Sequence, residues 1–384
     1  PTADYARSTG FDKVLLDDGV QSTDPYSDYV KWRNQHDPQR AVPYLQTMDV
    51  PAGKNPFRGV IDYRFTPTAW TGEQGVQMLR ELAVSSRPFF LHVSFFKPHS
   101  PYTVPEPWDA MYDDFLIPLP KQVSLEQIKE LPLPVQRQIL RGRPTYEIDR
   151  QRLQWIYRSY YASVSMVDRE IGLILDELDR SGKAEHTIVV FTTDHGDQLL
   201  EHGLEGKNLF FESSVHVPYM IRYPWHVKPA RYNTLVETID TVPTLLEFCG
   251  LPIPIRVEGR SLAPLIAREA FPRKYAARDR VFSENIIPEV ITNAGLDFSF
   301  TPGVGIKDIR HPDSKMVRTR RWKLNYYPGN DGELYDMEND PDETRNLIAS
   351  PEHQKQVQEL KASILDWMIT ADEASQIAPR WRIP

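Results

Sequence analysis

The feature that most constrains the fold is a long helical pattern that leads directly into an apolar strand. From Gln151 to Arg180, apolar residues recur at the spacing of one helix face, and Ser181-Gly182 predicts the end of that helix. The next segment, His186 to Thr193 (HTIVVFTT), is apolar and rich in β-branched residues, which predicts a central strand. Together these two segments favour an α/β domain.

The same order of helix and strand recurs along the chain. Residues Thr71 to Val84 have helical spacing, and Pro88 to Phe96 (PFFLHVSFF) follow as an expected buried strand. Val217 to Tyr223 predicts another strand, and Thr234 to Cys249 another helix. This repetition predicts a mostly parallel mixed sheet sandwiched by helices.

After about residue 266 the pattern changes to short strands separated by turns. We expect a small C-terminal α+β subdomain with an antiparallel sheet and one packed helix, so the predicted domains are residues 1–266 and 267–384. The expected strands are VFSEN, KMVRT, RWKLNYY and ELYDM, and the expected helix spans roughly Glu352 to Met368.

Composition narrows the classes of partner. The 384 residues carry a formal net charge of −8, which argues against a nucleic acid or an anionic membrane surface as partner. No apolar run approaches the roughly 18 residues of a membrane span. Cys249 is the single cysteine, so internal disulfides and a cysteine zinc cluster are excluded. We interpret Cys249, at a helix end, as a buried structural thiol.

The segment with the clearest chemical pattern is Thr192 to Glu212 (TTDHGDQLLEHGLEGKNLFFE), directly after the strand at 186–193. Asp194 and His195 offer a hard oxygen and a nitrogen at a strand end, where α/β sheets bind ligands. Lys207 is close enough in sequence to fold over the same site and contact an oxyanion such as sulfate or phosphate. In the alternative interpretation, Asp194 caps the turn and His195 is an ordinary surface residue.

A second loop, FFKPHSPY, also follows an expected strand. Two prolines restrict the backbone around His99, which could donate to a substrate oxyanion or act as a general acid. In the alternative interpretation, His99 is hydrogen-bonded to the backbone of its own loop.

Other polar residues are predicted to be structural. His202 and His216 would brace the loop, the MVRTRRW arginines would form a solvated strand face, and the acidic residues of the C-terminal subdomain would serve turns. The residues in the last two groups are Arg318, Arg320, Arg321, Asp336, Asp340, Asp342 and Glu343.

These segments carry a family resemblance. TTDHGDQLLEHGLEGK with FFESSVHVPYMIRYP resembles the second metal-binding motif of the sulfatase family, in the alkaline phosphatase superfamily. FLHVSFFKPHSPY resembles that family's loop with a substrate-contacting histidine. The helix YYASVSMVDREIGLILDELDRSG, the segment VEGRSLAPLI and the C-terminal MVRTRRWKLNYY with ELYDMENDPDETRNL follow in collinear order. The resemblance spans about residues 10 to 370.

The resemblance implies roles for four residues. Asp194 and His195 would be ligands of a divalent metal, Ca²⁺ first, with Mg²⁺, Mn²⁺ and Zn²⁺ as alternatives. Lys207 would contact the transferred group and the leaving-group oxygen, and His99 would hydrogen-bond the sulfate and help to protonate the leaving alcohol. Many sulfatases have Asn where this chain has His195, and His is similar to the choline-sulfatase and phosphonate-monoester-hydrolase branch.

The chain also departs from the family pattern. The family's formylglycine nucleophile, made from Cys or Ser in a Cys/Ser-x-Pro/Ala-x-Arg motif, has no match, and neither has the Asp-Asp metal pair that precedes it. Asp17 and Asp18 are not assigned to that pair, because GFDKV lies where the family has its segment after the nucleophile. We expect the nucleophile on an N-terminal segment absent from this chain.

The resulting expectation is hydrolysis of a small-molecule or saccharide sulfate ester. The alternatives are hydrolysis of phosphonate monoesters or phosphodiesters on the same scaffold, and a non-catalytic sulfatase-like binding protein. The alcohol part of the substrate, the oligomeric state and the location of the protein are left open by the sequence.

Overall fold

The computed structural model describes residues 10–17, 27–37, 55–59, 61–120, 123–141, 148–207, 209–269, 271–285, 314–327, 329 and 331–377. The chain divides into two compact units, which are described one by one. The first comprises Pro1–Lys121 and Glu147–Thr187, and the second comprises Gln122–Tyr146 and Ile188–Pro384. The domain boundary predicted at residues 266–267 lies inside the second unit and stays a prediction.

The first unit is built mainly of helices: α2 (Asp28–His36), α3 (Pro67–Ala83) and α6 (Arg150–Arg180), with short 3-10 turns at Tyr63–Phe65, Trp108–Ala110 and Ala184–His186. The helices predicted at 71–84 and 151–180 are confirmed. Helix α3 begins at Pro67 because the Thr66 hydroxyl accepts the Ala69 N–H at 3.2 Å and proline suits the first helical position. Asp149 caps α6 in the same way through the Arg152 N–H.

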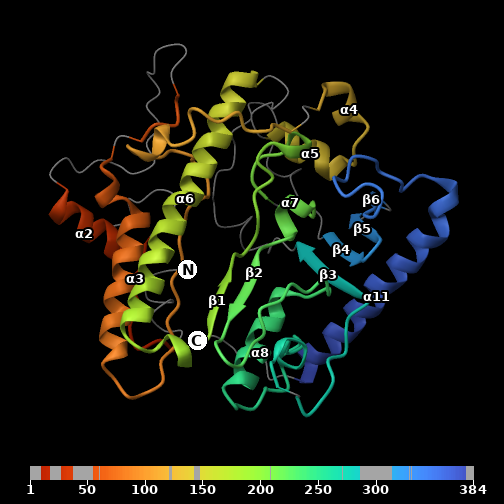
Figure 1. The fold of residues 1–384 in the computed structure, drawn as a ribbon. Coiled ribbons are helices and arrows are strands. Elements are labelled where there is room, and N and C mark those ends of the chain that lie inside the picture. The colour runs from red at the N-terminus through yellow and green to blue at the C-terminus, as the bar shows by residue number, and fades with distance from the viewer. Residues whose placement is uncertain are drawn as a thin grey trace. The chain divides into compact units, whose positions relative to one another are not determined.

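Helices α3 and α6 lie side by side (Figure 1). Glycines allow this close approach. A Cβ on Gly72 would overlap the side chain of Glu170, and one on Gly75 would crowd Ile174. Glu170 is 2% exposed and accepts the Tyr63 hydroxyl, so α6 is also joined to the 3-10 turn that precedes α3.

The strand predicted at 88–96 is wrong within the described residues. The segment forms no helix or turn and pairs with no described strand, and Phe90 is 65% exposed. Its apolar run is explained in part by ring contacts, since Phe90 stacks on Phe11 with ring centroids 5.8 Å apart.

The second unit contains a two-stranded sheet of β1 (Val189–Thr192) and β2 (Tyr219–Arg222). The pair is antiparallel, with Val189 opposite Arg222 and Thr192 opposite Tyr219. Among the described residues, parallel pairing is limited to a bridge between Arg58 and Val104 in the first unit, so the expected mostly parallel sheet is not seen there. The segment 193–218, which joins β1 to β2, contains a 3-10 turn at Glu201–Gly203 and the short helix α7 (Glu212–Val215).

Short helices accompany these strands: α4 (Leu125–Lys129), α5 (Leu133–Arg141), α7 (Glu212–Val215), α8 (Thr241–Phe248) and α9 (Ala263–Ile266), with 3-10 turns at Glu201–Gly203 and Thr238–Asp240. Helix α8 is shorter than the predicted 234–249, because Pro243 is tolerated only in a first turn. The interpretation of Cys249 as buried is wrong. Cys249 is exposed, since it caps α8 beyond the buried face formed by Pro243 and Thr244.

The C-terminal sheet confirms the predicted strands. Strands β3 (Arg280–Asn285), β4 (Ser314–Thr319), β5 (Trp322–Tyr327) and β6 (Asp331–Asp336) pair in sequence order and antiparallel. Helix α11 (Gln354–Ile377), after a 3-10 turn at Pro351–His353, packs across β4 and β5 (Figure 1). The core between helix and sheet consists of Val317, Leu324, Leu334, Val357, Leu360 and Ile364.

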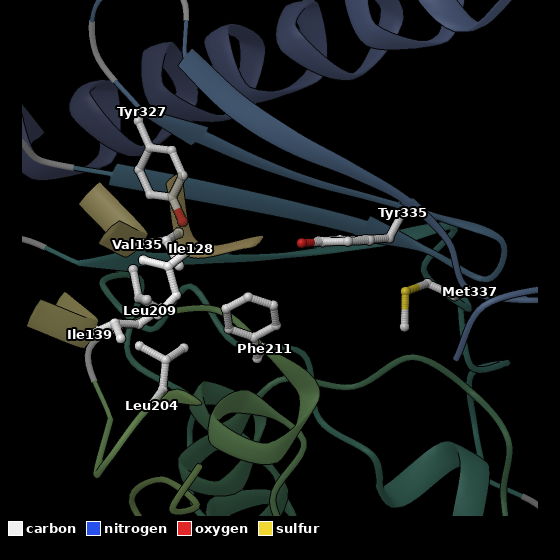
Figure 2. Packing of buried hydrophobic residues seen from close by; sticks show 9 residues of the cluster. All are labelled: Ile128, Val135, Ile139, Leu204, Leu209, Phe211, Tyr327, Tyr335 and Met337. Carbon is white, nitrogen blue, oxygen red and sulfur yellow. The ribbon is translucent and has the colours of Figure 1, made fainter. Parts of the chain in front are cut away.

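The other face of this sheet is also buried. Phe211 lies beneath the sheet, between Leu209 on one side and Tyr335 on the other (Figure 2). The cluster consists of Ile128, Val135, Ile139, Leu204, Leu209, Phe211, Tyr327, Tyr335 and Met337. The sheet therefore holds the segment 204–211 by apolar packing, at roughly 1.5–3 kcal/mol for each large side chain buried. Across the described parts of the chain, no helix is both long and apolar enough to span a membrane.

Candidate metal and anion site

Asp194 and His195 lie immediately after β1, and their side chains converge. Nε2 of His195 is 3.3 Å from Oδ2 of Asp194, while Oδ1 of Asp194 accepts the His195 N–H at 3.0 Å. The Asp194 side chain is 82% exposed and the His195 side chain 30%. The pair thus presents a carboxylate oxygen and a ring nitrogen together at the end of a strand.

The hydrogen bond of Nδ1, the other ring nitrogen of His195, determines whether Nε2 can bind a cation. Nδ1 of His195 is 2.7 Å from the carbonyl oxygen of Gly196, so Nδ1 carries the proton that it donates to that carbonyl. In the neutral ring, Nε2 then holds an electron pair directed beside a carboxylate oxygen. Two electron-pair donors at this separation suit a bound cation, and a backbone carbonyl on the second nitrogen is the usual partner of a metal-binding histidine.

The pair fits a divalent cation as part of a ligand set. Ca²⁺ takes six to eight oxygen ligands, and Zn²⁺ about four ligands of oxygen, nitrogen or sulfur. Asp194 and His195 supply two of them, and the described residues contain no group of three or more His, Cys, Asp or Glu side chains that could hold a metal. Further ligands are therefore needed to complete a site here.

Gly196 fixes the direction of the chain after the pair. Its N–H donates to the Ser214 carbonyl at 2.8 Å, and a Cβ at this position would overlap the Ser213 carbonyl oxygen. A residue with a side chain could not come so close to α7. The backbone beside His195 is thereby held against the backbone of α7.

The loop between Gln198 and Gly206 returns to its starting point. The Gln198 N–H donates to the Gly206 carbonyl and the Leu200 N–H to the Leu204 carbonyl, both at 2.7 Å. Lys207 follows directly and is half-buried, and its own carbonyl accepts Gln138 Nε2 at 3.5 Å. Because the loop closes in this way, the backbone of Lys207 lies close to the segment that carries Asp194 and His195.

His99 belongs to the first unit. Its Nδ1 is 2.6 Å from the Ser100 carbonyl oxygen, and its ring lies 4.6 Å from that of Phe96. With Nδ1 bound to the backbone, Nε2 can donate to a substrate only when the ring is protonated. The approach of His99 and Lys207 to one anion stays a prediction, because they belong to different units.

Lys97, two residues before His99, was not singled out from the sequence. It is 2% exposed and donates to the Pro101 carbonyl, and burial lowers the pKa of its ammonium group to about 7. The Lys97 side chain thereby ties together the two ends of the His99 turn.

His202 and His216 were predicted to brace the loop, and His202 does so. His202 stacks on Phe211, and burial lowers the pKa of its ring to about 4. His216 is 79% exposed, and its Nδ1 lies 3.6 Å from Oε2 of Glu212.

A buried charge cluster beside α7 was missed by the sequence interpretation. Nζ of Lys323, which is 0% exposed, lies 2.9 Å from Oε1 of Glu212 and 2.7 Å from Oε1 of Glu343. Nε of Arg318 lies 3.1 Å from the same oxygen of Glu212. The prediction of a solvated strand face is therefore wrong for Arg318. Glu343 does lie in a turn, since its N–H donates to the Asp340 carbonyl at 3.1 Å, but its carboxylate is buried against Lys323. Asp340 does serve a turn, since it accepts the N–H groups of Thr344 and Arg345.

Comparison with known proteins identifies the family. Residues 2–251 match the sulfatase family model, so the chain belongs to the sulfatase family. It is 29% identical to an arylsulfatase of Clostridium perfringens over 311 residues, which cover 78% of this chain and 57% of the relative. It is 28% identical to a choline-sulfatase of Rhizobium meliloti over 270 residues, which cover 70% of this chain and 48% of the relative. The chain thus spans about half the length of these curated relatives.

The fold agrees with that assignment. The structure is similar to that of a phosphonate monoester hydrolase of Agrobacterium radiobacter, with a TM-score of 0.74 and 24% sequence identity, covering 90% of this chain and 69% of the other. This similarity confirms the mixed α/β fold. Members of the sulfatase family in general use a divalent metal and a formylglycine.

Proposed function

We propose that this chain provides part of the active site of a sulfuric ester hydrolase. The observation that supports it is the convergence of Asp194 Oδ2 and His195 Nε2 at the end of β1, in a chain of the sulfatase family. We propose a sulfate ester of a small molecule or saccharide as substrate. Relatives of this chain include an endo-4-O-sulfatase and an N-acetylglucosamine-6-O-sulfatase, both of Bacteroides thetaiotaomicron.

Asp194 and His195 would hold the divalent cation, with Ca²⁺ as the first candidate. When bound, a divalent cation polarises the oxygens of the ester and stabilises the charge that develops on them. The exposed carboxylate of Asp194 faces solvent and is accessible to an ion, and the Gly196 carbonyl orients the ring of His195.

Lys207 and His99 would act on the ester itself. The Lys207 ammonium would donate charge-assisted hydrogen bonds to the sulfate and to the leaving-group oxygen. His99 would donate from Nε2 in its protonated form, because Nδ1 is held by the Ser100 carbonyl. The same proton could pass to the leaving alcohol. The formylglycine of the family has no matching motif in this chain, and we assign no residue to its role.

The function can be tested on the protein expressed from its whole gene, with p-nitrophenyl sulfate as substrate. Replacing Lys207 by Ala should lower kcat/KM by about 100-fold, the effect of losing one donor to a developing oxyanion. Lys228→Ala, an exposed lysine of the same unit, is the matched control and should leave the rate unchanged. Sulfate-ester binding without any turnover would instead favour the non-catalytic binding protein.

Hydrolysis of phosphonate monoesters is the second candidate function. It is supported by His195 at a position where many sulfatases have Asn, and by the fold shared with phosphonate monoester hydrolases of Agrobacterium radiobacter and Silicibacter pomeroyi. Measuring kcat/KM for p-nitrophenyl sulfate and for a phenylphosphonate monoester in one preparation separates the two. A higher value for the phosphonate would replace the first proposal by the second.

A further inference from the structure

The C-terminal sheet directs a buried ammonium group at the loop that carries the proposed metal ligands. Lys323 lies on β5, is 0% exposed, and is shared by the carboxylates of Glu212 and Glu343 at 2.9 and 2.7 Å. Arg318, on the neighbouring strand β4, reaches the same oxygen of Glu212 at 3.1 Å. Two cations thus balance two carboxylates in a site from which water is largely excluded.

Glu212 is held at its backbone as well as at its side chain. Its N–H donates to Oε2 of Glu343 at 2.6 Å, so one carboxylate binds Lys323 with one oxygen and the start of α7 with the other. Burial opposes ionisation of Glu212, but Lys323 and Arg318 outweigh it, so the pKa of Glu212 is lowered. Removal of the Lys323 charge would leave the buried carboxylate of Glu343 and the part-buried carboxylate of Glu212 with Arg318 alone.

The backbone of α7 contacts the metal loop near the C-terminal end of the helix. The Ser214 carbonyl accepts the Gly196 N–H at 2.8 Å, and the Gly196 carbonyl in turn accepts Nδ1 of His195 at 2.7 Å. A continuous series of hydrogen bonds and one short helix therefore joins Lys323 to the imidazole. A shift of α7 would move Gly196 with it. The Gly196 carbonyl accepts Nδ1 of His195 and so leaves Nε2 as the ring nitrogen that can bind a metal.

We propose that Lys323 is a positioning residue for the Asp194–His195 pair, acting through Glu212 and α7. The inference rests on the proposed function, because it treats Asp194 and His195 as metal ligands. Lys323 does not touch the cation or the substrate. Its role is to hold α7 where Gly196 can fix the tautomer and direction of His195.

The test measures Ca²⁺ affinity by calorimetric titration of the whole protein, at a temperature where circular dichroism shows each variant folded. Lys323→Met should weaken Ca²⁺ binding by about 10-fold, the lower end of the effect of residues that orient metal ligands. Arg318→Gln is the milder second variant, because Arg318 is part-exposed, and it should weaken binding less and in the same direction. Hydrogen exchange of the Gly196 amide should become faster in both variants.

Glu333→Gln is the matched control. Glu333 is equally buried in the same sheet and feels the charge of Lys323, but its hydrogen bonds go to Asn325, Tyr327 and Tyr335 and not to α7. It should lower thermal stability without changing Ca²⁺ affinity or Gly196 exchange. Equal affinity losses in Glu333→Gln and Lys323→Met would overturn the proposal, since the effect would then be general destabilisation.

The proposal and the proposed function fail in different ways. If Asp194→Ala abolishes Ca²⁺ binding while Lys323→Met and Arg318→Gln bind normally, the metal pair stands and the role of Lys323 is refuted. If Asp194→Ala binds Ca²⁺ as tightly as the parent protein, the metal assignment is refuted, and with it the role of Lys323 toward it.

Discussion

The imidazole of His202 stacks on the ring of Phe211, with the ring centroids 4.1 Å apart and the planes 19° from parallel. The contact closes the loop between Gln198 and Gly206 over the apolar cluster beneath the C-terminal sheet. Burial lowers the pKa of His202 to about 4, so the ring is neutral wherever the loop is folded near neutral pH. The loop is thereby sensitive to acid.

Acid sensitivity should follow the titration of His202. The pKa of His202 is about 6.5 in the unfolded chain and about 4 in the folded protein. As the pH falls, the unfolded chain therefore binds a proton first, and the free energy of unfolding decreases between about pH 6.5 and 4. The loss from this group is about 3 kcal/mol. His202→Phe keeps the stacking and cannot titrate, so its urea-unfolding free energy should fall less over this window than that of the parent protein. Equal pH slopes for the two proteins would contradict the prediction.

Loss of the Asp194 carboxylate should remove metal-dependent activity. Asp194→Ala leaves His195 without its converging oxygen, so we expect turnover to be abolished and Ca²⁺ affinity to fall by more than about 10-fold. Asp197→Asn is the local control, because that carboxylate accepts the Leu199 N–H and is not an expected ligand. Full activity in Asp194→Ala, measured with p-nitrophenyl sulfate, would refute the metal role.

A methyl group at Gly196 should separate the metal loop from α7. Gly196→Ala places a Cβ on the Ser213 carbonyl oxygen, and we expect a loss of about 1–3 kcal/mol in unfolding free energy together with weaker Ca²⁺ binding. Gly172→Ala in α6 is the control. A Cβ there meets nothing within 4 Å, so the helix should gain about 0.5–1 kcal/mol. Thermal and urea unfolding should show that Gly196→Ala is less stable than the parent protein and Gly172→Ala more stable.

His99 should matter most for poor leaving groups. Alkyl sulfates need protonation of the leaving alcohol, whereas activated aryl sulfates need little. His99→Ala should therefore lower kcat more on an alkyl sulfate than on p-nitrophenyl sulfate. Equal losses on both substrates would leave His99 with a binding role only.

Local periodicity predicted the parts of the fold that depend on neighbours in sequence. Helix α6 buries one face, and the strands of the C-terminal sheet pair with their neighbours in sequence, so local patterns predict both. The strand predicted at 88–96 failed for the opposite reason. A run such as PFFLHVSFF indicates an extended chain, but strand pairing depends on a distant partner that the run does not specify.

In the candidate site, too, the residues that could be predicted are those that lie close together in sequence. Asp194, His195 and Lys207 are close in sequence and follow a strand, so their motif was visible. The cluster around Lys323 joins residues that are 111 positions apart, and each looks ordinary in its own segment. The single local sign was a lysine between Trp322 and Leu324 in the strand WKLNYY, where both faces proved to be buried.

The ion pairs of Lys323 have a consequence for protein engineering. The C-terminal sheet is not an interchangeable module, because Glu212 depends on Lys323 and Arg318 from that sheet and on Glu343 from the turn after it. A chimera that joins this chain to the C-terminal sheet of another sulfatase must bring matching partners for Glu212. Without them, a graft that preserves every proposed ligand would still place those ligands on a displaced loop.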